Sequence, residues 1–164
     1  MVRMRFLATL LLAVILASCS SGGGSKESVD VQNAWVRAAT AMAMGGHETT
    51  TPEAGGMEGM GANSAAYMLL RNNAPAADKL LRVESDVAEA VELHISEMQG
   101  EVMTMRPIEF VEVPANDEAV LKPGGMHVML IGIKHDLKPG DKVKLVLVFE
   151  NAGRIDVEAE VRAP

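Results

Sequence analysis

The sequence has few of the residues that build disulfide frameworks, thiolate sites and aromatic surfaces. Its 164 residues include a single cysteine, one tryptophan, one tyrosine and three phenylalanines. One cysteine cannot form an intramolecular disulfide, so the fold does not depend on covalent cross-links. Because this residue, Cys19, lies near the amino terminus, the domain that follows contains no thiolate metal ligand and no thiol nucleophile.

Positive charge is also in deficit. The 15 Lys and Arg residues face 22 Asp and Glu residues, for a formal net charge of −7 at pH 7. Such an acidic chain repels polyanions, so we do not expect nucleic acid as a partner. The spacing of Ser, His and Asp shows no catalytic arrangement, and we do not expect an enzyme. The length suits one domain with short additions and is sufficient to bury a core.

Residues 1–18 predict a lipoprotein signal peptide. Arg3 and Arg5 precede an apolar run over 6–17 that is too short to span a membrane as a helix. Leu-Ala-Ser-Cys at its end resembles the lipobox of bacterial lipoproteins, which implies cleavage before Cys19 and lipidation of that residue. The alternative is an ordinary signal peptide with an incidental cysteine. Removal of the peptide takes away two arginines and no acidic residue, so the mature chain is more acidic still.

The segment after the cleavage point predicts a tether. Residues 19–28 are rich in Ser and Gly, a composition typical of flexible linkers. We therefore expect an extracytoplasmic protein that is lipid-anchored to a bacterial membrane, on its periplasmic or cell-surface side, with its folded domain over 29–164.

Alternation of polar and apolar residues predicts an all-β domain over 29–164. Period-two patterning is typical of strands with one buried face. Leu-Lys-Pro-Gly occurs twice, at Leu121 and Leu137, and Pro-Gly suits the central positions of a type II turn. This number of short strands favours a β-sandwich or β-barrel, although 87–92 could instead be helical. Strands are expected at 29–37, 65–72, 79–84, 87–95, 108–113, 124–134, 142–149 and 154–161.

Two histidines and two methionines form a spaced pattern, His94-x10-Met105-x21-His127-x-Met129. His127 and Met129 lie two apart on an expected strand, so both side chains project from one face. Thioether sulfur is a soft ligand that selects Cu(I), and imidazole suits copper in either oxidation state. The pattern therefore favours a Cu(I) site over a zinc or iron site.

The same residues and their surroundings resemble the extracytoplasmic copper chaperones called PCu(A)C proteins. The resemblance runs from about Trp35 to Val161 and rests on 34–37 (AWVR), 65–68 (AAYM), 105–107 (MRP) and 121–130 (LKPGGMHVML). It implies a cupredoxin-like Greek-key β-barrel that binds one Cu(I) at an exposed site. It also implies delivery of copper to cytochrome c oxidase, through a Cu(A)-type domain or another copper-assembly protein. The ligands it implies are His94, Met105, His127 and Met129.

Residues 38–64 predict an inserted loop, because they are rich in Ala, Gly, Thr and Met and show no sustained period. The loop is longer than the resemblance implies. Exposed methionine is unusual, so we interpret the soft ligands here as an auxiliary copper site; the alternative is an insertion with incidental methionines. These residues are Met42, Met44, His47, Met57 and Met60.

Several alternatives stay open. Met98, Met103 and Met126 lie near the pattern and are further candidate ligands, although Met126 suits a packing role better. An electron-transfer cupredoxin is excluded, since it needs a cysteine ligand that the domain lacks. Ligand identity does not separate copper delivery from copper storage or resistance. A β-sandwich surface module without metal, its methionines packed in the core, is the remaining alternative.

Overall fold

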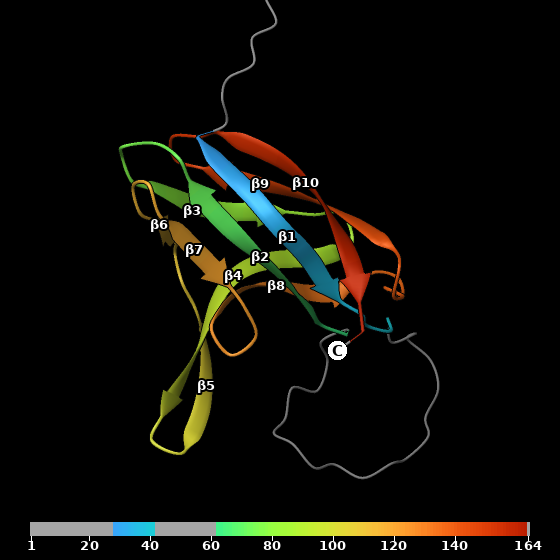
Figure 1. Cartoon of the computed structure of the whole chain (residues 1–164). Helices are drawn as coiled ribbons and strands as arrows, with labels where there is room; N and C mark the ends of the chain where they lie inside the picture. Colours follow the sequence, from blue (N-terminus) through green and yellow to red (C-terminus); the bar gives the residue numbers. More distant parts are fainter. Residues whose placement is uncertain (1–27, 42–61, 164) are drawn as a thin grey trace, which may run out of the picture.

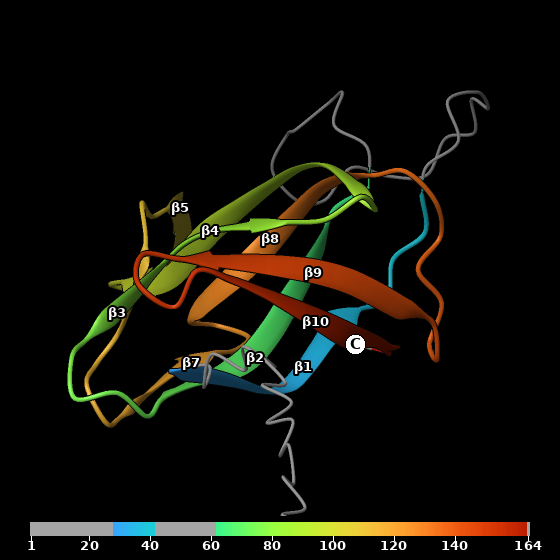
Figure 2. The same cartoon turned by 90° about the horizontal axis from the view of Figure 1, so that it is seen from above.

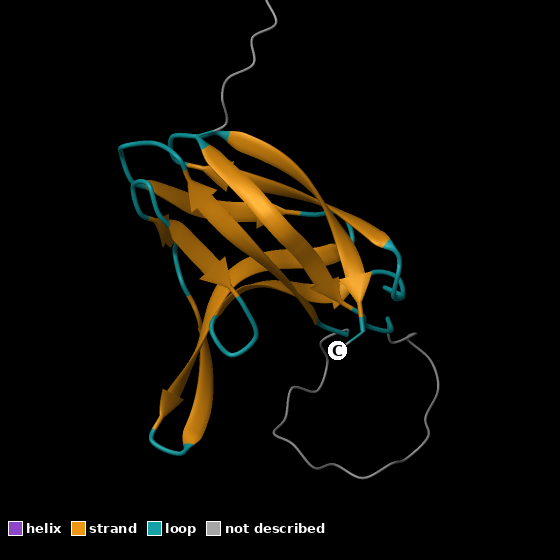
Figure 3. Ribbon diagram, in the orientation of Figure 1, coloured by secondary structure: helices purple, strands orange, loops and turns teal. Residues whose placement is uncertain are grey.

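A computed structural model describes residues 28–41 and 62–163, which form ten strands (Figures 1 and 3). The predicted all-β fold is confirmed. Within these ranges there is no helix with the length and apolarity needed to cross a membrane. The expected signal peptide, Cys19 and most of the tether lie outside the described residues. The strands are β1 (Val29–Arg37), β2 (Ser64–Asn72), β3 (Asp78–Glu84), β4 (Ala88–Gln99), β5 (Val102–Pro107), β6 (Val111–Val113), β7 (Glu118–Leu121), β8 (Met126–Ile133), β9 (Lys142–Phe149) and β10 (Arg154–Arg162).

The strands join in one curled sheet with the order β5-β4-β8-β2-β1-β10-β9-β3-β6. Only the β1–β10 pair is parallel among these described strands. The sheet curls round its core (Figure 2), so that β3 and β4 contact each other although they lie towards opposite ends of the order. Along one edge, the strand β2 pairs with two strands in succession: Ala65 pairs with Met129 of β8, and Met68 pairs with Leu121 of β7.

The core is aliphatic, in keeping with the shortage of aromatic residues. The alternation expected in the last strand is observed, since Ile155, Ala159 and Val161 are buried and their charged neighbours are exposed. Burial of such side chains supplies most of the favourable free energy of folding. The fully buried leucines are Leu70, Leu80, Leu121, Leu130, Leu145 and Leu147.

Both Pro-Gly turns are confirmed. Gly124 and Gly140 have φ of 73° and 93°, which suits the third position of a type II turn and favours glycine there. The turn hydrogen bonds run from Gly125 N to Lys122 O, at 3.1 Å, and from Asp141 N to Lys138 O, at 2.9 Å. The first of these turns joins β7 to β8 and so determines where β8 begins.

The prediction for 108–113 is wrong in its first half. Only Val111–Val113 of that range forms a strand, and β5 lies just before it, at Val102–Pro107. Apart from Thr104, every residue of β5 is exposed, so the strand lacks the alternating apolar pattern that identifies a half-buried strand. The short β7 was missed as well. The helical alternative for 87–92 is also wrong, since β4 is extended from Ala88 to Gln99.

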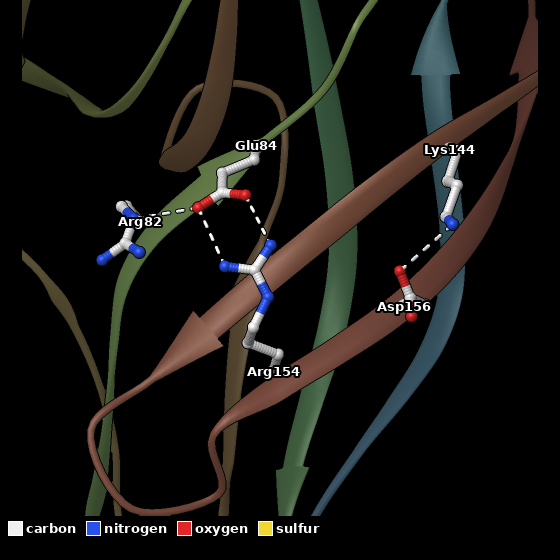
Figure 4. A network of polar contacts seen from close by, with 5 residues as sticks. All are labelled: Arg82, Glu84, Lys144, Arg154 and Asp156. Atoms are coloured by element: carbon white, nitrogen blue, oxygen red, sulfur yellow. Dashed lines mark hydrogen bonds and ion pairs between the residues drawn. The ribbon is translucent and has the colours of Figure 1, made fainter.

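A surface network connects β3 to β10 across β9 (Figure 4). Arg154 donates two hydrogen bonds to the Glu84 carboxylate, at 3.1 and 2.6 Å, and Arg82 donates a third at 3.1 Å. The hydrogen bond from Arg154, assisted by Arg82, lowers the pKa of Glu84. Lys144 and Asp156 form a neighbouring ion pair at 3.5 Å.

This network predicts a pH-dependent difference in stability. A carboxyl group whose pKa is lower in the folded state stabilises the fold above its unfolded pKa, and this stabilisation is lost as the pH falls through the folded pKa. We expect Glu84→Gln to be slightly less stable than the native protein at pH 7, by the small amount typical of exposed ion pairs. Urea unfolding of both proteins measures the difference in their free energies of unfolding. It should be present at pH 7 and should vanish below the pKa of Glu84, where the carboxyl group is protonated. A difference that persists in acid contradicts this explanation.

Candidate metal centre

The sheet register places the four predicted ligands on one face of three neighbouring strands. On β4 and β8, His94 lies directly opposite His127, and Met129 lies two residues further along β8. On β5, Met105 lies opposite Ser96, which is two residues from His94 on β4. Residues opposite each other in an antiparallel pair project from the same face. The structure therefore places the four side chains on one face of neighbouring strands, and their binding of a metal stays a prediction.

The two imidazoles are more buried than the Met105 thioether. His127 is 4% exposed and the His94 side chain 12%, whereas Met105 is 53% exposed. Met129 is half-buried between these extremes. A cavity of about 240 Å³ is lined by Met105, His127 and Met129, together with Tyr67. The His94 ring is not part of this lining and lies 6.0 Å from the His127 ring, centroid to centroid.

Hydrogen bonding determines which nitrogen of His127 carries the proton. Nδ1 of His127 lies 2.9 Å from the Gly125 carbonyl oxygen. A carbonyl oxygen only accepts, so Nδ1 donates and Nε2 keeps its lone pair. The same oxygen accepts a hydrogen bond from Ser96 N on β4, at 3.1 Å. The orientation of His127 is thus linked to the neighbouring strand.

His94 is held in the opposite tautomer. Its Nε2 lies 2.8 Å from the Glu92 carboxylate, two residues earlier on the same face. With the Nε2 proton directed at this acceptor, Nδ1 has a free lone pair. Nδ1 of His94 is buried without a hydrogen-bond partner, alone among the side-chain nitrogen and oxygen atoms of the described residues. Such an atom is costly to bury and requires an explanation; a metal ion bound to it would provide one.

The histidines continue a row of rings across the sheet. Trp35 and Tyr67 lie 4.5 Å apart, centroid to centroid, and Tyr67 lies 6.3 Å from His127. Tyr67 is 7% exposed. Packing of this kind restricts the His127 ring from the side away from His94.

The donor set distinguishes this site from common zinc and calcium sites. In the ranges 28–41 and 62–163, no three His, Cys, Asp or Glu side chains gather in a way that could hold a metal ion. A metal on this face would therefore need thioether sulfur, and Met105 and Met129 supply it beside the two imidazoles. Two thioethers and two imidazoles fit Cu(I) better than a hard cation.

Sequence reasoning missed two supports of the site. The role of Glu92 could have been predicted, since a carboxylate two residues before a histidine on a strand lies on the same face as that histidine. The role of the Gly125 carbonyl could not, because no side chain marks it. Of the further candidates, Met126 packs against the core, and Met98 and Met103 are exposed on the β4–β5 hairpin. Residues 42–61, which include the auxiliary candidates, lie outside the described residues.

Solved structures of similar fold define the class to which this domain belongs. The copper-bound PCuAC domain from PmoF2 matches it with a TM-score of 0.60 at 25% identity, covering 84% of this chain and 94% of that domain. Apo-DR1885 from Deinococcus radiodurans, at 24% identity, shares the fold with a TM-score of 0.55 over 99% of this chain and 97% of its own. The domain is of the PCuAC type, so the family resemblance and the cupredoxin-like fold are confirmed.

The sequence comparisons give the family. A sequence model of the family described as "Putative lipoprotein LpqE-like" matches residues 29–161. The chain belongs to this family of LpqE-like lipoproteins. The protein described as "Putative lipoprotein Lxx21020" of Leifsonia xyli subsp. xyli is 26% identical over 147 residues, which is 89% of this chain and 76% of that protein. The uncharacterized protein RP573 of Rickettsia prowazekii is 28% identical over 96 residues, which is 58% of this chain and 53% of that protein.

Proposed function

We propose that this protein is a lipid-anchored, extracytoplasmic Cu(I) chaperone whose ligands are His94, Met105, His127 and Met129. The buried, unpartnered Nδ1 of His94 carries this proposal, because it lies beside a second imidazole whose Nε2 is also free. The similar PmoF2 domain is copper-bound, which supports copper as the cargo. Membership of a lipoprotein family supports the anchor at Cys19.

The arrangement suits a protein that must both hold and release copper. Thioethers carry no proton, so only the two imidazoles compete with protons for the metal. Met105 is the most exposed of the four ligands, and an incoming ligand from a partner would replace it first. Copper then leaves by ligand exchange and stays Cu(I), so no electron is transferred and the protein acts without catalysis.

The acceptor we propose is a copper-assembly protein or the Cu(A)-type domain of cytochrome c oxidase. A lipid at Cys19 keeps the carrier at the membrane surface, where such a domain is also held. The test is transfer from the copper-loaded protein to a purified Cu(A)-type domain. Transfer faster than spontaneous dissociation of copper supports delivery; transfer at the dissociation rate indicates storage instead.

The binding step is tested by anaerobic Cu(I) titration in competition with a chromogenic chelator. A chain that begins at Ser20 retains every described residue and avoids the lipid. We expect one tight equivalent of Cu(I) in the four-ligand site. If the chelator keeps all the copper, the proposal is wrong and the surface module without metal takes its place.

Glu92 should tune the affinity through His94. Removal of an outer hydrogen-bond partner of a metal ligand typically lowers affinity by about 10- to 100-fold, and we expect a loss in this range for Glu92→Ala. Glu92→Gln should retain most of the affinity, because its amide oxygen still accepts the Nε2 proton. The matched control is Glu97→Ala, which removes a carboxylate from β4 that faces Arg106 instead. Equal losses in Glu92→Ala and Glu97→Ala would contradict the positioning role.

The auxiliary site in the 38–64 segment stays a prediction. Its five candidate residues lie outside the described part of the chain. Replacing the methionines by leucine and the histidine by alanine should remove any copper that this segment holds. Unchanged stoichiometry in that variant would show that the segment binds none.

A further inference from the structure

The β4–β5 hairpin carries thioethers beyond the predicted ligand set. Met98 on β4 lies directly opposite Met103 on β5. Each is 60% exposed, and neither belongs to the core. The hairpin extends away from the barrel (Figure 1), so the rest of the domain does not cover its end. A packing role therefore does not explain why both positions hold methionine.

The turn brings the two methionines close together. The hairpin closes with a two-residue loop, Gly100-Glu101, in which Gly100 has φ of 67°. Because Glu101, at the second loop position, does not have a positive φ, the loop is a type II′ turn. The pair that flanks such a loop, Gln99 and Val102, is hydrogen-bonded, so the next pair, Met98 and Met103, is not.

The hydrogen bonding at the other end of the hairpin leads to the same assignment for Met98 and Met103. Ile108 N donates to Leu93 O at 2.8 Å, and alternation from this pair also places Met98 and Met103 in a non-hydrogen-bonded pair. Cα atoms in such pairs are only about 4.5 Å apart and their side chains are closer than in hydrogen-bonded pairs. Met105 follows two residues after Met103 and shares its face. Three thioethers thus lie on one side of the hairpin.

We propose that Met98, Met103 and Met105 form an outer Cu(I) site from which copper passes to the four-ligand site. This proposal rests on the proposed function and adds its entry route. Met103 and Met105 line the same cavity as His127 and Met129, so the two sites are continuous. Thioether ligands are soft and neutral, and they select Cu(I).

Met105 belongs to both sites and serves as the pivot of the transfer. Copper held by Met98, Met103 and Met105 exchanges the first two sulfur atoms for Met129 and the two imidazoles. The metal stays Cu(I) throughout, and no electron or proton is transferred. The outer site lacks imidazole and is more exposed, so it holds copper less tightly than the inner site and favours inward movement.

The test is an anaerobic Cu(I) titration of the protein and of Met98→Leu/Met103→Leu. Leucine removes the sulfur at nearly constant volume, and both positions are exposed, so folding should be preserved. The background for every sample carries leucine at Met42, Met44, Met57 and Met60 and alanine at His47. Met68→Leu, which removes a buried methionine from β2, is the matched control.

When the inner site is filled, Met105 is bound there and the outer site keeps the sulfur atoms of Met98 and Met103, so we expect a second, weaker equivalent in the background protein and in Met68→Leu. The double variant should lose this weaker equivalent and keep the tight one. The methyl NMR signals of Met98 and Met103, identified by their absence from the double variant, should shift as the second equivalent binds. A single equivalent in the background protein, or a second one that survives the double substitution, overturns the outer site and leaves the proposed function intact. No tight equivalent at all would overturn both.

Discussion

Replacement of His127 by alanine is expected to weaken Cu(I) binding by about 100-fold or more, because it removes the ligand best fixed by the structure. Loss of an outer partner of a ligand alone costs about 10- to 100-fold, and loss of the ligand itself should cost at least as much. Competition with a chromogenic Cu(I) chelator measures the change. The reason for the large effect is structural, since the Gly125 carbonyl oxygen, which also accepts a hydrogen bond from Ser96 N, already holds the His127 ring with Nε2 free.

The control for this substitution is His135→Ala. His135 is exposed and bonds only to the Asp136 carbonyl group in the described structure, so its loss should leave copper binding unchanged. Because His127 is buried, the circular dichroism and thermal unfolding of His127→Ala must also be measured. A folded His127→Ala protein that binds Cu(I) as tightly as the native protein would refute the site.

Replacement of Leu130 by alanine should have the converse effect. Leu130 lies on β8 but projects from the face opposite to His127 and Met129, and it is fully buried. Truncation of a buried leucine typically lowers the free energy of unfolding by about 2–5 kcal/mol. We expect a loss of this size in urea unfolding, whereas the tight Cu(I) equivalent is retained at temperatures where the variant is folded.

Leu130→Met provides the comparison, because it nearly conserves volume and should cost less than about 1.5 kcal/mol. Loss of the tight Cu(I) equivalent from a folded Leu130→Ala protein would show that the two faces of β8 are not independent. Together, the substitutions at His127 and Leu130 separate binding from folding within one strand.

The two faces of β8 could be predicted from the sequence, but the partners of this strand could not. Two residues apart on an apolar strand, His127 and Met129 had to share a face, and the structure agrees. The pairing of β4 with β8 joins segments far apart in the sequence, and the local alternation of polar and apolar residues does not predict its register. The spaced pattern and the family resemblance joined His94 to His127, and the structure places them opposite each other.

The strand of Met105 shows where local patterns fail. Alternation detects a strand through its buried face, and β5 has almost none. Its place in the sheet depends on hydrogen bonds to β4 and on the tight turn at Gly100. The ion pair of Glu84 and Arg154 was equally unpredictable, because two exposed charges far apart in the sequence give no sign that they will pair.

The parallel pairing of β1 with β10 affects the order in which the protein can be completed. The first and last described strands lie side by side, so β1 has no partner on that edge until Arg154–Arg162 is available to pair with it. Pairings of such long sequence separation slow folding, because the chain must lose loop entropy before they form. We therefore expect closure of the β1–β10 edge to be a late step of folding, which leaves the aliphatic core open to water until the last strand has paired.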